Sequence, residues 1–96
     1  MPIDKELLKG STDMLVLSLI HDEPLYGYEI SKRLRAASKT MFAFGEGTLY
    51  PMLHKLERER LCESYWQEHG GRRRKYYLIT KKGKRMLEQI LRQILG

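Results

Sequence analysis

The stretch Thr48–Thr80, TLYPMLHKLERERLCESYWQEHGGRRRKYYLIT, decides the fold because its hydrophobic pattern changes from helical to strand-like. Apolar residues at helical spacing predict a helix from Thr48 to Arg60. Two strand-like runs follow: Glu63–Glu68 is rich in aromatic residues, and Arg73–Thr80 alternates roughly between polar and apolar residues. Gly70-Gly71 between them can supply the positive-φ residues of a tight turn. We therefore expect a helix followed by a two-stranded hairpin.

The predicted helix has an apolar face and a polar face. The apolar face, which we expect to be buried, contains Leu49, Met52, Leu53 and Leu56. The opposite face contains Tyr50, Pro51, His54, Lys55 and Arg58. Thr48 is a good N-cap residue, and this start places Pro51 in the first turn, where a missing N–H costs nothing.

Two more helices are expected before this stretch. Lys5–Asp22 has a broad apolar face, and Glu23-Pro24 ends it because a proline disfavours the α conformation in the residue before it. A second helix is predicted from Tyr26 to Ala37. Gly27 near its start has no side chain, so another backbone segment could approach closely there.

Thr80 is expected to cap a last helix with a broad apolar stripe. Three helices, a two-stranded hairpin and a final helix follow the order of a winged helix-turn-helix. We predict an α+β fold, mainly α, with the winged helix-turn-helix DNA-binding domain at residues 1–80. Residues 81–96 are expected to form a C-terminal dimerisation helix in the same compact unit.

A homodimer is expected because a 96-residue chain buries only about 60–65% of its unfolded surface. The stripe on the last helix has little left to pack against in so small a domain, which favours a subunit interface. The residues that we expect at this interface are Leu7, Leu8, Leu15, Leu87, Ile90, Leu91 and Ile94.

The positive charge is concentrated in one part of the chain. The net charge is +6, and eight of the 18 Lys and Arg residues lie between His69 and Leu87 with no acid among them. The rest of the chain holds ten basic residues against all 12 acids. A focused basic region favours a polyanionic partner, because a merely solvated basic face normally interleaves acids with bases.

The sequence gives no support for a catalytic or metal-binding protein. His21, His54 and His69 fall in different predicted elements without ligand-type spacing, and the common catalytic and nucleotide-binding motifs are missing. Cys62 is the only cysteine, which excludes an intrachain disulfide and Cys-rich zinc sites. No apolar run approaches the roughly 18 residues of a membrane span. We expect a cytoplasmic, nucleoid-associated protein that is not an enzyme and has no cofactor, metal or membrane partner.

The helix beginning at Thr48 is narrow enough to lie in the major groove of B-DNA, where base pairs are distinguishable. Thr48 and Tyr50 at its start are expected to reach base edges or phosphates, and His54 and Lys55 lie one turn later. Tyr50 has the alternative of packing against the second helix. Pro51 either contacts a thymine methyl group or starts the helix without any contact.

Further DNA contacts are expected outside this helix. Tyr28 and Lys32 on the second helix would lie near the DNA backbone, as the first helix of such a pair usually does. The cations expected to reach phosphates or a narrow minor groove from the hairpin tip are Arg72, Arg73, Arg74 and Lys75. Alternation along the strand sends some of these side chains to opposite faces. Trp66 either packs in the core or an interface, or serves as a ligand platform.

Five segments resemble the PadR family of bacterial transcriptional regulators: LKGSTDMLVLSLI, PLYGYEI, GEGTLYPMLHKLE, SYW and GGRRRKYYLIT. The resemblance runs from about Leu8 to Leu87, in family order. It implies a dimeric winged-helix repressor that binds an inverted-repeat operator in double-stranded DNA. Some members of the family release this DNA when a small-molecule effector binds. The positions that match the family's contact regions are Thr48, Tyr50 and Pro51 in the recognition helix, Arg72 to Lys75 in the wing, and Tyr28.

The single C-terminal helix resembles the small PadR subgroup. Some multidrug-sensing relatives stack planar ligands on a tryptophan of this helix, and the last helix here has none, because Trp66 lies in a predicted strand. The sequence does not decide whether an effector of another kind binds. The alternative function is a winged-helix protein-interaction module without sequence-specific DNA binding, although such a face is ordinarily more apolar and less cationic. RNA binding is a third interpretation.

Overall fold

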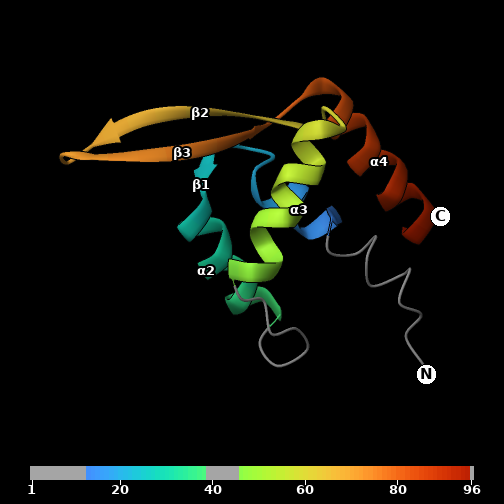
Figure 1. The fold of residues 1–96 in the computed structure, drawn as a ribbon. Helices are drawn as coiled ribbons and strands as arrows, with labels where there is room; N and C mark the ends of the chain where they lie inside the picture. The colour runs from blue at the N-terminus through green and yellow to red at the C-terminus, as the bar shows by residue number, and fades with distance from the viewer. Residues whose placement is uncertain (1–12, 39–45, 96) are drawn as a thin grey trace.

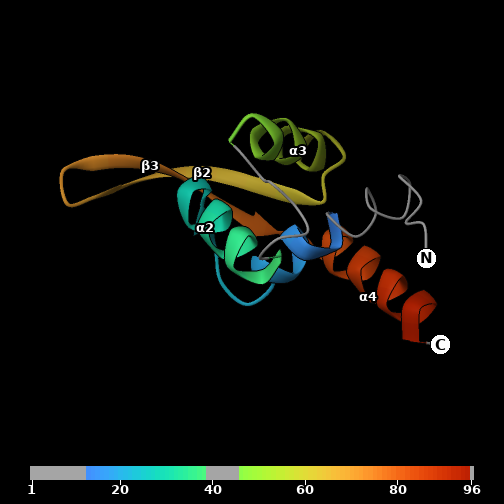
Figure 2. The same ribbon diagram turned by 90° about the horizontal axis from the view of Figure 1, so that it is seen from below.

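The chain forms an α+β winged helix in which a long hairpin extends beyond a group of helices (Figure 1). The computed structural model describes residues 13–38 and 46–95. Residues 13–19 are helical, and the later elements are β1 (Leu25–Tyr26), α2 (Gly27–Ser38), α3 (Glu46–Arg58), β2 (Cys62–His69), β3 (Arg72–Ile79) and α4 (Lys81–Leu95). The tip of the hairpin and the end of α4 lie at opposite ends of the molecule in both ribbon views (Figures 1 and 2). The predicted winged helix-turn-helix is confirmed.

The hairpin β2–β3, which we call the wing, has the predicted position and turn. Its strands pair antiparallel from Cys62↔Ile79 at the body of the protein to His69↔Arg72 at the tip. Gly70 and Gly71 have φ values of 59° and 83°, so both residues of the turn adopt the left-handed conformation. This is the two-residue turn that matches the twist of a hairpin, and it favours glycine at both positions.

A short third strand was missed by the sequence analysis. β1 pairs with β3 through Leu25↔Tyr77 and Tyr26↔Tyr76, which gives the sheet order β1-β3-β2. The prediction that Tyr26 begins the second helix is therefore wrong, and α2 begins at Gly27. The cause is tertiary: the outer edge of β3 offers unpaired backbone groups, and the extended residues after Pro24 bond to them.

Helix boundaries also differ from the prediction. The first helix is described from residue 13 and gives way to a turn at residue 20, whereas the predicted helix continued to Asp22. α3 begins at Glu46, two residues before the predicted start, so Thr48 is not the N-cap residue. Pro51 is consequently the sixth residue of α3 rather than a first-turn residue.

The core lies between the helices and one face of the sheet. Its buried members are Val16, Leu17, Ile20, Leu25, Ile30, Leu34, Leu49, Leu53, Leu56, Leu61, Cys62, Tyr77, Ile79 and Leu87. The predicted burial of Leu49, Leu53 and Leu56 is confirmed, and Met52 packs against this core while partly exposed. One face of α3 is thereby fixed, which leaves the opposite face at the surface.

A compact joint connects the end of α3 with the start of α4. Arg60 has a positive φ of 61°, and the Leu61 N–H donates to the carbonyl of Leu56 at 2.9 Å, which ends α3 in a left-handed C-terminal cap. The Thr80 hydroxyl donates to the Arg60 carbonyl at 2.7 Å and accepts from the Gly83 N–H at 3.0 Å. Thr80 is thus the predicted cap of α4. A Cβ at Gly83 would overlap the Leu61 carbonyl oxygen, so the two segments touch.

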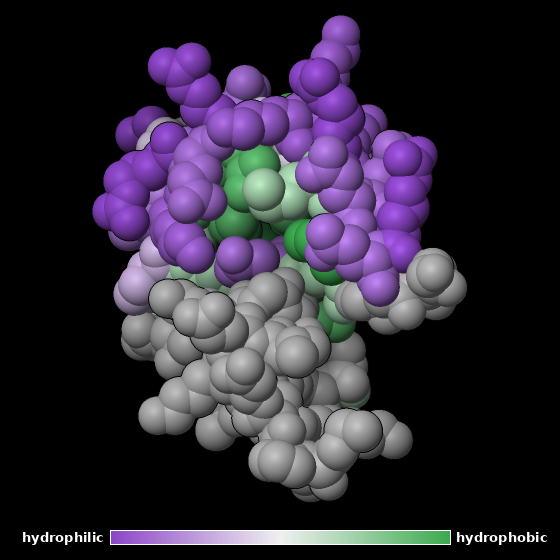
Figure 3. All heavy atoms as spheres, turned by 90° about the vertical axis from the view of Figure 1, so that its right-hand side faces the viewer, coloured by the Kyte–Doolittle hydropathy of each residue, from purple (hydrophilic) through white to green (hydrophobic). Residues whose placement is uncertain are grey.

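The residues expected at a dimer interface have different surroundings in the single chain. Leu87 is only 5% exposed and belongs to the core, whereas Leu91 is 38% exposed and Ile90 and Leu15 are partly buried. Leu7, Leu8 and the side chain of Ile94 lie outside the described residues. Viewed from the α4 end, apolar atoms show between hydrophilic side chains (Figure 3). The dimer interface stays a prediction, and Leu91 is the described residue that best fits it.

Candidate nucleic-acid interface

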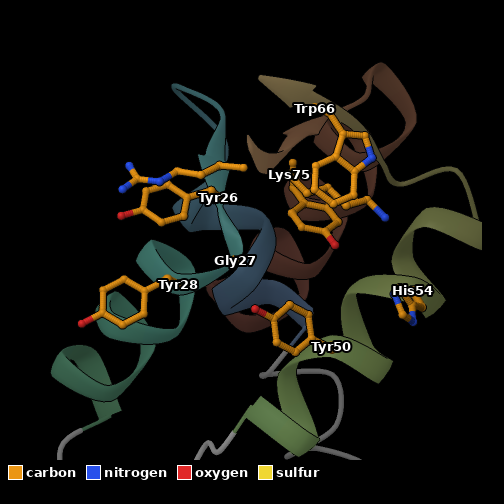
Figure 4. A pocket seen from close by; sticks show the side chains of 9 residues that line it. Tyr26, Gly27, Tyr28, Tyr50, His54, Trp66 and Lys75 are labelled. Carbon is orange, nitrogen blue, oxygen red and sulfur yellow. The ribbon is translucent and has the colours of Figure 1, made fainter. Parts of the chain in front are cut away.

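Three elements meet at an open cleft between the start of α2, the outer side of α3 and the wing (Figure 4). The cleft has a volume of about 430 Å³. Its lining residues are Tyr26, Gly27, Tyr28, Tyr50, His54, Trp66, Arg74, Lys75 and Tyr77. Six of these nine are among the residues singled out from the sequence as DNA contacts or as a ligand platform: Tyr28, Tyr50, His54, Trp66, Arg74 and Lys75. We call this surface the wing cleft.

The outer side of α3 presents most of the predicted recognition residues. Tyr50, Pro51 and His54 are exposed, because the core holds the opposite side of the helix. Lys55 is half-buried, and its Nζ lies 3.6 Å from Oδ2 of Asp13 in the first helix. The side chain of Thr48 lies outside the described residues. The structure thus places Tyr50, Pro51 and His54 at the surface and turns Lys55 toward an acid of the same chain.

Tyr50 and Gly27 touch across the wing cleft. A Cβ at Gly27 would lie 3.0 Å from Cε1 and 3.0 Å from Oη of Tyr50, so the missing side chain makes room for the ring. The expected backbone approach at Gly27 is therefore wrong, and a side chain occupies the space. Tyr50 as a whole remains 37% exposed. Tyr50 thus packs against α2, as one interpretation predicted, and still lines the cleft.

The four cations of the wing divide into two groups. Arg72 and Arg73 near the tip are exposed, whereas Arg74 and Lys75 are half-buried. The Arg74 guanidinium lies 4.5 Å from the centre of the Tyr26 ring. Arg74 is therefore held against an aromatic face, as cations commonly are, while the two tip arginines are accessible to a partner.

Lys75 has two neighbours on the protein. Its Nζ lies 5.6 Å from the centre of the Tyr77 ring and 3.9 Å from Oε1 of Glu57 in α3. Oε2 of Glu57 accepts a hydrogen bond of 2.6 Å from the Ser64 hydroxyl in β2. The sequence analysis did not select Glu57 or Ser64. Glu57 follows the buried Leu56 on the helix and faces the sheet, a position that becomes apparent only when the wing is folded over α3.

Trp66 lies on the surface of the wing. Its side chain is 57% exposed, so the expectation of core packing is wrong for this chain. The Arg73 guanidinium lies 5.2 Å from the centre of its ring. Trp66 and Lys75 are direct partners in the β2–β3 register and both line the wing cleft. An aromatic surface flanked by cations suits an anionic, ring-containing partner.

A row of tyrosines crosses the other face of the sheet. The Tyr65 and Tyr76 rings stack with centres 5.6 Å apart, and Tyr76 meets Tyr26 edge-on at 5.6 Å. Tyr26 then stacks with Tyr28 at 6.3 Å. The row connects the wing to the first turn of α2. Sequence alternation indicates that Tyr65 and Tyr76 lie in strands, but the place of Tyr26 depends on β1, which has no periodicity of its own.

The second helix presents its predicted contacts at the surface. Tyr28 is 54% exposed and Lys32 is also exposed. Arg33, by contrast, lies 3.1 Å from a carboxylate oxygen of Glu29 and 3.6 Å from one of Glu23. Lys32 is therefore accessible, whereas Arg33 is paired with acids of the same chain, and the contact of Lys32 with DNA stays a prediction.

The Cys62 thiol and the Tyr77 hydroxyl beneath the wing are kept neutral. Burial, followed by the nearby Glu57 carboxylate, raises the pKa of the Cys62 thiol to about 11. The same two causes, in the same order, raise the pKa of Tyr77 to about 12. A buried thiol with a raised pKa is a poor nucleophile. Among the described residues, no group of three or more His, Cys, Asp or Glu is arranged to hold a metal ion.

Within the described residues, no helix combines the length and apolar character required to span a membrane.

Residues 16–89 match the family described as "Transcriptional regulator PadR-like family". A transcriptional regulator from Clostridium thermocellum is similar in structure, with a TM-score of 0.81 and 34% identity over 93% of this chain and 87% of that one. A PadR-like transcriptional regulator from Bacillus cereus has a TM-score of 0.81 and 36% identity over 93% and 85% of the two chains. PadR of Bacillus subtilis, solved in complex with operator DNA, has a TM-score of 0.74 and 23% identity over 84% of this chain and 47% of that one. At that identity the last similarity shows the fold alone.

Proposed function

The chain belongs to the PadR-like family of transcriptional regulators, and from this premise we propose that it represses transcription by binding a specific DNA operator as a homodimer. The operator is an inverted repeat, because a two-fold dimer presents the same recognition surface twice. The Bacillus subtilis PadR structure contains operator DNA, which supports the proposal by analogy of fold. Transcriptional regulation of this kind requires no enzymatic activity, and it takes place in the cytoplasm at the nucleoid.

The wing cleft carries this proposal, because it brings a polar helix face and a cationic hairpin to one side of the molecule. The exposed side of α3 enters the major groove, where Tyr50, His54 and Pro51 meet base edges. Thr48 shares this role at the start of the helix. The tip arginines Arg72 and Arg73 reach phosphates or the adjacent minor groove.

The first turns of α2 and the inner part of the wing complete the proposed contact. Tyr28 and Lys32 meet the phosphate backbone, since both are exposed on α2. Arg74, Lys75 and Lys55 are held by neighbours on the protein, so they contribute less to affinity for random DNA than the exposed tip arginines. Phosphate contacts fix register, whereas contacts to base edges select the sequence.

The dimer forms through α4 in this proposal. Leu91 and Met86 are exposed apolar residues of that helix, at 38% and 36%, and an apolar stripe of this kind is typical of a subunit contact. Half-sites one helical turn of DNA apart, about 34–36 Å, or a multiple of it, suit a dimer of this type. A small-molecule effector releases the DNA, and the volume of the wing cleft lies in the range of small-molecule sites.

The test is binding of the purified protein to DNA from upstream of its own coding sequence. Fluorescence anisotropy would compare that DNA with random duplex of the same length at 50 and 200 mM salt. We expect a clear preference for the upstream DNA, and a loss of about 10³–10⁵ in affinity between the two salt concentrations if six to ten phosphates are neutralised. Equal affinity for both duplexes, or no binding, would overturn the proposal and favour the protein-interaction alternative.

A further inference from the structure

We infer that Glu57 is a specificity-determining residue, because its ion pair with Lys75 of the wing keeps this lysine from contacting random DNA. This inference rests on the proposed DNA binding. Glu57 lies in the last turn of α3 and contacts both strands of the wing: Ser64 of β2 donates to its Oε2 at 2.6 Å, and Lys75 of β3 lies 3.9 Å from its Oε1. One carboxylate thus joins the recognition helix to the hairpin.

The Ser64 hydrogen bond restricts the position of the carboxylate. Ser64 and Lys75 lie on the same face of the sheet, since Ser64 pairs with Tyr77 and Trp66 pairs with Lys75 in the register. Glu57 and Lys75 are both about one-third exposed, at 35% and 31% of their side chains. Solvent therefore screens this pair less than it would screen a fully exposed ion pair.

A second observation supports the placement of this negative charge. After burial, the negative charge of Glu57 is the next cause of the raised pKa values of both Tyr77 and Cys62. This negative charge therefore lies close to the region between α3 and the sheet, from which the Lys75 side chain extends. A phosphate that approaches Lys75 also approaches this fixed carboxylate and is repelled by it.

The consequence for binding follows from the geometry of the two kinds of complex. On random DNA the protein is loosely placed, and Lys75 stays with Glu57, so nonspecific affinity comes from exposed cations such as Arg72, Arg73 and Lys32. On the operator, α3 is seated in the groove, and a phosphate held next to Lys75 replaces the ion pair. Lys75 then contributes to the specific complex alone, which raises the ratio of specific to nonspecific affinity.

The substitution Glu57→Gln tests this inference, because the amide keeps an oxygen for Ser64 and removes the charge. For random DNA we expect the plot of log affinity against log salt to steepen by about 0.9 per protomer, and affinity at 150 mM salt to rise about fivefold per protomer. For the operator the slope should not change. The ratio of the two affinities therefore falls.

Two controls distinguish the loss of the Glu57–Lys75 ion pair from a general change in net charge. Glu59→Gln makes the same change of charge at an exposed position of the turn that follows α3, and it should leave the slope on random DNA unchanged. In a Lys75→Met background, Glu57→Gln should have no further effect on random DNA. An equal effect of Glu59→Gln, or an effect of Glu57→Gln that persists without Lys75, would overturn the inference.

Lys75→Met alone provides an independent arm if Glu57→Gln fails to fold. It should reduce the slope on the operator by about 0.9 per protomer and leave the slope on random DNA unchanged; equal reductions on both would refute the assigned role of Glu57. The wild-type protein separates this result from the proposed function. A wild type that prefers its operator, with unchanged slopes in the variants, defeats the inference alone, whereas a wild type without preference defeats both.

Discussion

Tyr50 of α3 lies against Gly27 of α2, at the point where a Cβ on Gly27 would be 3.0 Å from Cε1 and 3.0 Å from Oη of the tyrosine. The position of a proposed base-contacting side chain is therefore set by the absence of a side chain on the neighbouring helix. Because Tyr50 is also 37% exposed, small displacements of its ring alter the surface that meets DNA.

Gly27→Ala should impair operator binding more than it impairs folding. The free energy of unfolding should change by less than about 1 kcal/mol, since alanine favours a helix and the ring can shift. Operator affinity should fall about tenfold, in the range of one lost base contact of about 1–3 kcal/mol. Anisotropy and chemical denaturation measure the two effects. In a Tyr50→Ala background the added alanine should make no further difference to binding, and a further loss would place its effect elsewhere.

Tyr50→Ala itself should reduce discrimination between operator and random DNA. The expected loss is about 1–3 kcal/mol in the difference between the two binding free energies, because the base-edge contact is absent from the nonspecific complex. Competition between the two duplexes gives this difference directly. Equal weakening on both would leave Tyr50 with a packing role alone.

Arg73 and Arg74 are adjacent in sequence but should behave differently. Arg73→Ala should weaken binding to operator and random DNA alike and reduce the salt slope by about 0.9 per protomer, because its exposed guanidinium meets a phosphate. Arg74→Ala should reduce the salt slope less and lower stability by about 0.5–1 kcal/mol, since its guanidinium lies on the Tyr26 ring. Salt titrations and thermal unfolding of both variants provide the comparison, and identical slopes would contradict the division of the wing cations.

Leu91 and Leu87 should separate association from folding. Leu91→Glu should give a folded monomer, because the side chain is exposed in the single chain. Leu87→Glu should destabilise the protein by about 3 kcal/mol or more, because it places a charge in the core. Light scattering after gel filtration reports the mass, and circular dichroism reports folding. A dimer that survives Leu91→Glu would remove Leu91 from the interface.

Arg60→Gly should stabilise the protein. Arg60 adopts a positive φ of 61°, which costs a non-glycine residue about 1–2 kcal/mol, and glycine recovers part of that cost. A gain of about 0.5–1 kcal/mol is expected, or about 2–8 °C in the melting temperature of a domain of this size. Arg58→Gly serves as the control inside the helix and should be destabilising. No gain at position 60 would mean that the arginine side chain makes a compensating contact.

Local pattern predicted the hairpin and the existence of the helices in the described residues, because each extends over enough residues to show its period. β1 was missed because two residues have no period and pair only when β3 is already in place. The start of α3 was misplaced because Thr48 is a strong capping residue and Gly47 before it resembles a break. Alternation placed Trp66 in a strand but did not predict its exposure, and it gave no sign of Glu57, whose role depends on how the wing lies over the helix.

The hydroxyl of Thr80 has a consequence for the spacing of operator half-sites that the protein can bind. It bonds to the Arg60 carbonyl and to the Gly83 N–H, so the last residue of the α3 cap and the first turn of α4 move as one piece. In a dimer held by α4, the distance between the two α3 helices is then fixed. An operator whose half-sites were separated by one extra base pair would be rotated by about a tenth of a turn, and this stiff joint would have little freedom to follow it.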